Sequence, residues 1–203
     1  MGLITAGLLP VAACCGFHAA LHIAALPLLR ALLPSSFTCH LHDLEPHMRI
    51  KLSRLVRGMV YSVFALACGI ILLLRCRSLW DLCRVFTPLH DIAFLVALGH
   101  WLVSFVEDWL ATNRAFIIRW PNNPGLERLA LERGTHKVNR YGCLVHHLMA
   151  AAAFAFLRRT RLLGGMGAIG LLYEGPIIAM NLREMLVDFE DPLGWSRKLG
   201  GRR

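Results

Sequence analysis

Long segments without charged residues are the feature that most restricts the fold of this chain. Residues 11–29 contain no Asp, Glu, Lys or Arg, and at ~1.5 Å per residue a helix of this length crosses the hydrocarbon core of a bilayer. Four more apolar segments follow, at 55–74, 91–111, 142–157 and 162–186. With 56% hydrophobic residues, the chain has more apolar surface than one water-soluble core can bury. The sequence predicts an all-α, polytopic transmembrane helix bundle of about five spans.

The polar segments outline one transmembrane domain that covers residues 1–203. Residues 1–33 hold the first span, 34–54 a basic interfacial loop, 55–186 the remaining spans and 187–203 a charged tail. Arg57, near the start of the second span, is expected to extend its guanidinium group to the membrane surface. Between the second and third spans, the stretch SLWDLCRVF predicts a short surface helix.

The net charge of +9 bears on partners and location. The basic residues are spread over the loops and are not interleaved with aromatic residues on one helix, which argues against nucleic-acid binding. An excess of Lys and Arg is typical of loops that face the cytosol or the mitochondrial matrix. We therefore expect partners within the membrane, namely lipids and other integral membrane subunits. The expected location is the mitochondrial inner membrane or the endoplasmic reticulum.

Histidines in the apolar segments raise the question of a metal or haem. His18 and His22 lie one helical turn apart in the first span, and His100 in the third span could join them as a ligand. No second pair at this spacing faces them, and the seven cysteines form no C-x-x-C motif. A metal or haem carrier is therefore the weakest alternative. The sequence predicts no metal site and no cofactor, with a bound phospholipid or acyl chain as the ligand to expect.

Polar residues recur on one face of the third span. His100, Ser104 and Glu107 follow the i, i+4, i+7 spacing, and Asp108 lies about one turn from the end of the span. A charged group at the centre of a span costs about 3 kcal/mol, so each one requires a reason. For Glu107 two interpretations stay open: a buried carboxylate paired with histidine or arginine, or a residue of a functional site.

The fourth and fifth spans contain the remaining candidates. His146 and His147 in YGCLVHHLMA point ~100° apart on a helix, so one can face the bundle interior and the other a second helix. A neutral imidazole is a plausible general base or nucleophile. In LLYEGPIIAMNLREML, a Gly-Pro step after Glu174 interrupts the backbone ladder, which suits the wall of a cavity, and Asn181 and Arg183 follow. The glycines of GGMGAIG predict close helix packing.

These stretches, in this order, resemble the TLC-domain family, which includes ceramide synthases and smaller, largely non-enzymatic lipid-associated membrane proteins. Members have a paired histidine in one span, matched by His146 and His147. The smaller relatives then have a glutamate, an asparagine seven positions on and an arginine nine positions on, matched by Glu174, Asn181 and Arg183. The basic stretch KLSRLVRGMVYSVFALACG and the acidic FVEDWL also fit, so the resemblance covers residues 50–186.

The chain also departs from the family pattern. Ceramide synthases have clustered aspartates where this sequence reads Tyr173-Glu174-Gly175. Members usually continue with one or two spans after the arginine, whereas the sequence stops soon after Arg183. The resemblance thus implies a shortened and divergent member, whose helix bundle other membrane subunits are expected to complete.

Two functions follow from this resemblance. The first is a non-catalytic membrane protein that binds or organises lipid as an accessory or structural subunit of a larger complex. Its lipid- or cavity-lining residues are expected to be His100, Glu107, Asp108, Asn181 and Arg183. The alternative is an acyl-CoA-dependent acyltransferase related to ceramide synthases, with catalytic residues His146, His147 and Glu174.

Overall fold

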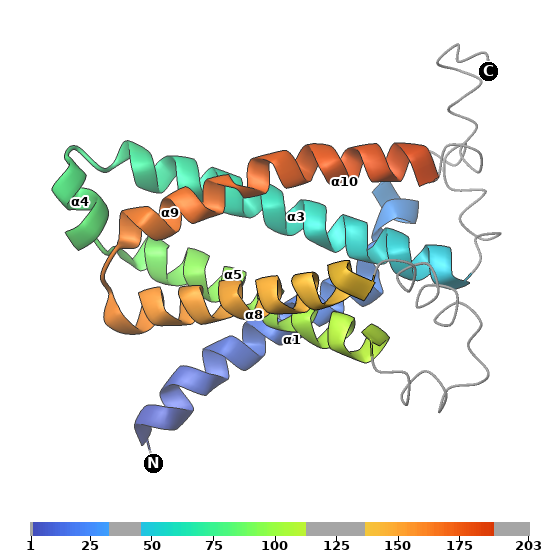
Figure 1. Ribbon diagram of the computed structural model, residues 1–203, viewed down its shortest axis with the longest axis horizontal. Helices are drawn as coiled ribbons and strands as arrows, with labels where there is room; N and C mark the ends of the chain where they lie inside the picture. Colours follow the sequence, from blue (N-terminus) through green and yellow to red (C-terminus); the bar gives the residue numbers. More distant parts are fainter. Residues whose placement is uncertain (1, 33–45, 113–136, 189–203) are drawn as a thin grey trace, which may run out of the picture.

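The computed structural model describes residues 2–32, 46–112 and 137–188, and every regular element in these ranges is a helix. The helices are α1 (Gly2–Leu32), α3 (Pro46–Leu74), α4 (Leu79–Arg84), α5 (Pro88–Thr112), α8 (Lys137–Thr160), α9 (Gly164–Leu172) and α10 (Glu174–Asp188). The long helices run along one common direction, and the short α4 lies at one end of the bundle (Figure 1). The all-α class is therefore confirmed.

Three helices are long and apolar enough to cross a membrane. They hold the candidate spans Gly7–Leu32, Arg49–Leu74 and Pro88–Leu110, which correspond to the first three predicted spans. The helices at the fourth and fifth predicted spans do not meet this standard, because α8 has polar first turns and α9 and α10 contain only 9 and 15 residues. The structure thus identifies a helical membrane protein with three helices of spanning character.

Two boundaries of the prediction require comment. Helix α3 begins at Pro46, a position in the first turn that proline tolerates, so the expected interfacial segment 34–54 includes the basic start of the helix to which it leads. Residues 34–45 of that segment and 189–203 of the expected tail lie outside the described ranges. The expected surface helix is confirmed as α4, where Ser78 and Asp81 form a capping box.

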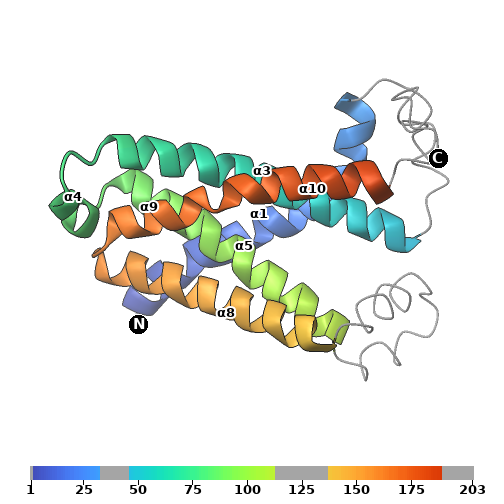
Figure 2. The same cartoon turned by 45° about the horizontal axis from the view of Figure 1, so that its top comes forward.

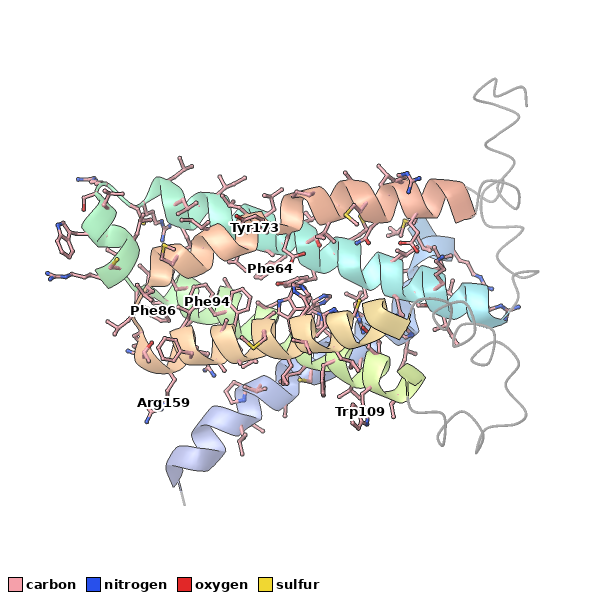
Figure 3. All side chains as sticks on the ribbon, in the orientation of Figure 1. Phe64, Phe86, Phe94, Trp109, Arg159 and Tyr173 are labelled. Carbon is pink, nitrogen blue, oxygen red and sulfur yellow. The ribbon has the colours of Figure 1, made fainter. Side chains whose placement is uncertain are left out.

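The apolar core lies between α3, α5, α8 and α9. Phe94 of α5 is fully buried there, and its ring lies 5.5 Å from that of Phe154 on α8. Figure 3 shows Phe94 inside the bundle, whereas Trp109 and Tyr173 lie at its outer surface. The core side chains are Tyr61, Ala65, Cys68, Leu72, Ala93, Phe94, Ala97, Leu98, Ala151, Phe154, Ala168 and Leu171.

Glycines bring α9 against its neighbours, as the sequence predicts. A Cβ atom on Gly164 would lie 2.3 Å from the carbonyl oxygen of Val85, and one on Gly165 would lie 2.6 Å from Leu82 Cα. Both distances are far below van der Waals contact with backbone atoms. These two positions therefore have to be glycine for α9 to pack on α4 and the segment that follows it.

The fifth predicted span is two helices. Helix α9 ends at Leu172 and α10 begins at Glu174, so the interruption lies beside the Gly-Pro step. Pro176 has no N–H to donate to the carbonyl of Leu172, four residues earlier, and its ring crowds that carbonyl. Together α9 and α10 follow the length of α3 (Figure 2).

Helix α1 packs across α5 and α3 and then leaves the bundle. Its closest approach is at Gly99 of α5, where a Cβ atom would lie 2.8 Å from that of Cys14. The helix continues through Pro27 and changes direction in its last turns (Figures 1 and 2). Its N-terminal half diverges from α5 and α8 (Figure 1). Residues of α1, α5 and α8 line a crevice there.

Candidate functional site

Buried ion pairs join α3 to α5. Arg57 is only 2% exposed, and its guanidinium group donates to both carboxylate oxygens of Glu107, with Nη2 2.9 Å from Oε2. The same Nη2 donates to Ser104 Oγ at 3.2 Å. The expectation that Arg57 extends to the membrane surface is therefore wrong. The Glu107 carboxylate of the neighbouring α5 pairs with the guanidinium group inside the bundle, so Arg57 does not need to reach water.

A second arginine extends this network to α8. Arg54 Nη2 donates to Asp108 Oδ1 at 2.8 Å, and its Nε lies 3.1 Å from Glu107 Oε2. On the other side, His147 Nδ1 lies 3.2 Å from Asp108 Oδ2, an ion-pair distance without the alignment of a hydrogen bond. We call Arg54, Arg57, Glu107, Asp108 and His147 the ion-pair network.

The open question about Glu107 is answered as far as its partners are concerned. Its carboxylate pairs with Arg57 and Arg54, and His22 Nδ1 of α1 lies 3.6 Å away. The predicted pairing with arginine and histidine is confirmed, but the Glu107 side chain is 23% exposed, so the carboxylate is half-buried. Two arginines and two carboxylates also leave the charged part of the network balanced, which lowers the cost of placing it at membrane depth.

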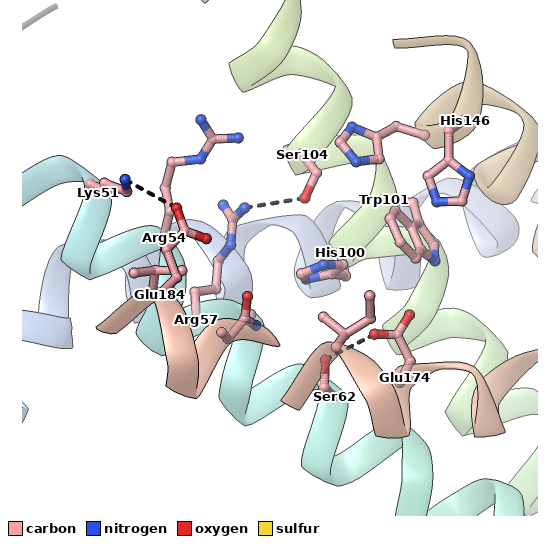
Figure 4. Close-up of a pocket in the computed structure, with 15 residues that line it drawn as sticks. Lys51, Arg54, Arg57, Ser62, His100, Trp101, Ser104, His146, Glu174 and Glu184 are labelled. Atoms are coloured by element: carbon pink, nitrogen blue, oxygen red, sulfur yellow. Dashed lines mark hydrogen bonds and ion pairs between the residues drawn. The ribbon is translucent and has the colours of Figure 1, made fainter. Parts of the chain in front are cut away.

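The ion-pair network borders a cavity of about 540 Å³ between α3, α5, α8 and α10 (Figure 4). We call it the polar cavity, because most of its walls carry hydrogen-bonding side chains. Lys51 at its edge pairs with Glu184 of α10 at 3.1 Å. The lining residues are Lys51, Arg54, Leu55, Arg57, Gly58, Ser62, His100, Trp101, Ser104, His146, His147, Glu174, Ile177, Asn181 and Glu184.

Aromatic rings form the floor of the polar cavity. His100 is 7% exposed and stacks on Tyr61 with ring centroids 3.8 Å apart. Trp101 lies with its ring centroid 5.2 Å from that of His146. His100 Nδ1 is buried without a hydrogen-bond partner among the described residues. Buried polar atoms are nearly always satisfied, so this nitrogen indicates a site for a polar ligand group or water.

A second cavity of about 470 Å³ continues from the first. Its walls are mainly apolar and come from α8, α9 and α10, and we call it the apolar cavity. Trp101, His146, Glu174 and Ile177 line both cavities. At this junction Glu174 is 6% exposed and accepts a hydrogen bond from Ser62 Oγ at 2.8 Å (Figure 4). Phe156, Met166 and Tyr173 line the apolar cavity and are exposed, so it opens sideways on the bundle surface.

The structure brings most of the candidate residues together. His100, His146, His147, Glu174 and Asn181 line the polar cavity. Glu107 and Asp108 stand behind it and hold the arginines that line it. Arg183 is exposed and does not line either cavity, so its expected place is wrong. It lies two residues past Asn181 on α10, a spacing that turns a helical side chain to the opposite face.

Sequence reasoning missed the basic wall of the polar cavity. Lys51, Arg54 and Arg57 are spaced three residues apart, and Gly58 and Ser62 continue the same face of α3. This spacing was a usable signal, because three cations on one face of an apolar helix predict a polar partner facing them.

The histidines of the first and third spans do not form a metal site. His18 and His100 contact edge to face with ring centroids 5.2 Å apart, and His18 Nε2 lies 3.1 Å from the carbonyl oxygen of Val96. Within residues 2–32, 46–112 and 137–188, no group of three or more His, Cys, Asp or Glu side chains is placed to hold a metal ion.

The fold and the site together define a helical membrane protein with a polar cavity at membrane depth that continues into an apolar one. Comparisons with protein-family models, curated proteins and solved structures find no match to this chain. The resemblance to the TLC-domain family therefore stays a proposal.

Proposed function

We propose that this chain is a TLC-like integral membrane protein that binds a membrane lipid without catalysis, with the lipid headgroup in the polar cavity and an acyl chain in the apolar cavity. The observation that carries the proposal is the continuity of the two cavities through Trp101, His146, Glu174 and Ile177. A phospholipid has the same division into a polar and an apolar part. A soluble metabolite would not require the apolar half.

The proposal includes five membrane crossings. Helix α8 packs along α5, and the α9–α10 pair follows α3, so both lie parallel to helices of spanning character (Figures 1 and 2). The interruption at Tyr173 is acceptable at membrane depth because the freed backbone borders a cavity and not hydrocarbon.

The charges of the polar cavity favour a neutral or zwitterionic headgroup. Lys51, Arg54 and Arg57 each have a carboxylate partner, so no described cation of the wall is left to neutralise an anion. The unpartnered Nδ1 of His100 suits an oxygen of a phosphodiester or an ester. Glu174 interacts with the hydroxyl groups of Ser62 and Tyr61, and its place at the junction of the two cavities suits a cationic or hydroxyl group of the headgroup.

The proposal also concerns assembly. The sideways opening between α8 and the α9–α10 pair, with exposed Phe156, Met166 and Tyr173, is where another integral membrane subunit would cover the lipid. We therefore propose an accessory or structural role in a larger complex of the mitochondrial inner membrane or the endoplasmic reticulum.

Photocrosslinking tests the lipid site. The full chain is reconstituted with phosphatidylcholine that carries a diazirine in its acyl chain, and labelled peptides are mapped by mass spectrometry. We expect labels on α8 and α9 near Phe156 and Met166, and loss of these labels in Ala153→Trp, which fills the apolar cavity. Ala152→Trp is the matched control, because Ala152 is exposed on the same helix but lines neither cavity.

Two outcomes would contradict the lipid site. The first is labelling spread evenly over all exposed helix faces in the unmodified chain. The second is equal loss of the α8 and α9 labels in Ala152→Trp and Ala153→Trp, since the effect would then come from bulk on α8 and not from the cavity.

One observation favours the acyltransferase as the second candidate. Asp108 lies within ion-pair distance of His147 Nδ1, as an orienting carboxylate does beside a general base, and His146 borders both cavities. An acyl chain in the apolar cavity would place its carbonyl at their junction. Transfer of labelled acyl groups from acyl-CoA would establish this activity if it is abolished in His147→Ala and retained in Leu148→Ala, because Leu148 is exposed on the same helix and lines neither cavity.

A further inference from the structure

The crevice between α1, α5 and α8 lies at the end of the bundle where α4 is found, away from the ion-pair network. It measures about 470 Å³. Val11 and Leu98 provide apolar walls from two helices of spanning character, and Arg158, Arg159 and Arg161 provide the basic part, with Asp91 as the acidic lining residue. Figure 3 shows Arg159 extending from α8 on the side where α1 diverges. Three arginines against one aspartate leave this crevice two positive charges.

The arginines are not required to cap α8. Basic residues at a helix C-terminus often satisfy its last carbonyl groups. Here Arg161 N donates to the carbonyl oxygen of Leu157 at 2.9 Å, and Thr160 Oγ1 donates to that of Phe156 at 2.9 Å. The backbone and a hydroxyl group satisfy these two carbonyl groups, and no guanidinium hydrogen bond to a carbonyl group of α8 is found among the described residues. The guanidinium groups remain available for another partner.

Their described partners leave donors to spare. Arg158 Nε donates to Asp91 Oδ1 at 2.8 Å, which uses one of its five N–H groups. The Arg161 guanidinium carbon lies 6.0 Å from the centre of the Phe86 ring, a contact that positions the group without using its hydrogen-bond donors. No ion pair joins Arg159 or Arg161 to another described residue of 2–32, 46–112 or 137–188.

The backbone adds an independent observation. Arg161 and Leu163 have φ angles of 56° and 57°, in the left-handed region that favours glycine. The sequence has glycine next to them, at 164 and 165, where close packing demands it, but not at these two positions. Glycine at 161 would relieve this backbone, so Arg161→Gly removes the guanidinium group without straining the turn.

We infer that this crevice binds the phosphate group of an anionic phospholipid, with Arg158, Arg159 and Arg161 around the phosphate and Val11 and Leu98 against the acyl chains. Arginine suits a phosphate because its planar fork donates two hydrogen bonds at once. The lipid source follows from the apolar walls, which belong to helices that cross the membrane. Basic crevices between membrane helices at headgroup depth are suited to anionic lipids. This site does not depend on the proposed function.

The test measures lipid retention in four forms of the full chain. The unmodified chain and the variants Arg161→Gly, Arg159→Gln and Arg84→Gln are placed in nanodiscs of phosphatidylcholine with increasing phosphatidylglycerol. Bound phosphatidylglycerol is then counted by native mass spectrometry after transfer to detergent. We expect about tenfold weaker retention in Arg161→Gly and in Arg159→Gln, since a charge-assisted hydrogen bond is lost in each. Arg84→Gln, the matched control at an exposed arginine of α4 that lines none of the three cavities, should retain lipid as the unmodified chain does.

Stability separates binding from folding. In nanodiscs of phosphatidylcholine alone, Arg161→Gly should unfold at a temperature no lower than the unmodified chain, because glycine removes an unfavourable φ. Equal retention in Arg161→Gly and the unmodified chain would overturn the inference. Equal loss in Arg84→Gln would also overturn it. So would release of the lipid by millimolar inorganic phosphate, because the ligand would then be a soluble anion.

Discussion

Removal of Arg57 should be among the most damaging single changes in this protein. In Arg57→Met the similar length of the side chain preserves packing, but Glu107 loses two hydrogen bonds and Ser104 loses one. A buried carboxylate deprived of its cation typically costs 3–5 kcal/mol. Glu107 keeps Arg54 at 3.1 Å and is 23% exposed, so we expect the lower end, about 3 kcal/mol.

A matched control uses the same substitution in an exposed pair. Arg158 and Asp91 also join two helices at 2.8 Å, but their side chains are 21% and 39% exposed. Such pairs contribute at most about 1 kcal/mol, so Arg158→Met should cost about 1 kcal/mol or less. The assay is unfolding of the purified chain in mixed micelles with increasing sodium dodecyl sulfate, followed by tryptophan fluorescence, with phosphatidylcholine as the sole lipid.

The double variant Arg57→Met/Glu107→Leu completes the cycle. It leaves no unpaired charge at this pair, so it should cost about 2 kcal/mol less than the sum of the two single changes. Equal costs for Arg57→Met and Arg158→Met, or additivity within about 0.5 kcal/mol, would refute the reasoning that burial makes this pair strong.

Two further predictions concern α9 and α4. Gly165→Ala should destabilise the protein by about 2 kcal/mol, because its Cβ atom would lie 2.6 Å from Leu82 Cα. Gly170→Ala in the same helix is the control, since the nearest neighbour of its Cβ atom is 3.9 Å away. In the same assay it should be neutral or stabilising by about 0.5 kcal/mol. The backbone N–H of Arg77, with that of Ser78, donates to Asp81 and lowers the pKa of its carboxyl group. Because the folded pKa of Asp81 lies below the unperturbed value of 3.8, the carboxylate and its capping box are present at neutral pH and should protect the amides of α4 from hydrogen exchange. This protection should fall as the pH drops below 3.8. In Asp81→Ala it should be absent at all pH values.

The helical class and the first three spans could be predicted because they depend on local composition. A run without charges between basic ends has one stable arrangement in a bilayer, whatever its neighbours. The break beside Pro176 could also be anticipated, because a proline removes a specific N–H. Only the structure shows that the break lies at Tyr173, between the end of α9 at Leu172 and the start of α10 at Glu174. The sequence does not specify how the carbonyl groups before Pro176 are accommodated.

The site was only half accessible to sequence reasoning. Polar residues stand out within an apolar span, which is why His100, Glu107 and His147 were found. The sequence places Arg54 in the interfacial loop and predicts that Arg57 extends to water, because cations near a span end usually do so. Whether such a cation extends to water or stays inside the bundle depends on a carboxylate of a different helix, about fifty residues further along the chain. Only tertiary packing brings that carboxylate to the same depth.

The sideways opening lined by Phe156, Met166 and Tyr173 sets the terms on which any occupant competes. A lipid that enters through this opening diffuses in the plane of the bilayer, where it competes for the site with all the other lipids. Occupancy then follows the mole fraction of that molecule among the surrounding lipids and is indifferent to its concentration in water. If the proposed lipid binds there, a change in membrane composition would therefore change the occupancy of the cavity directly.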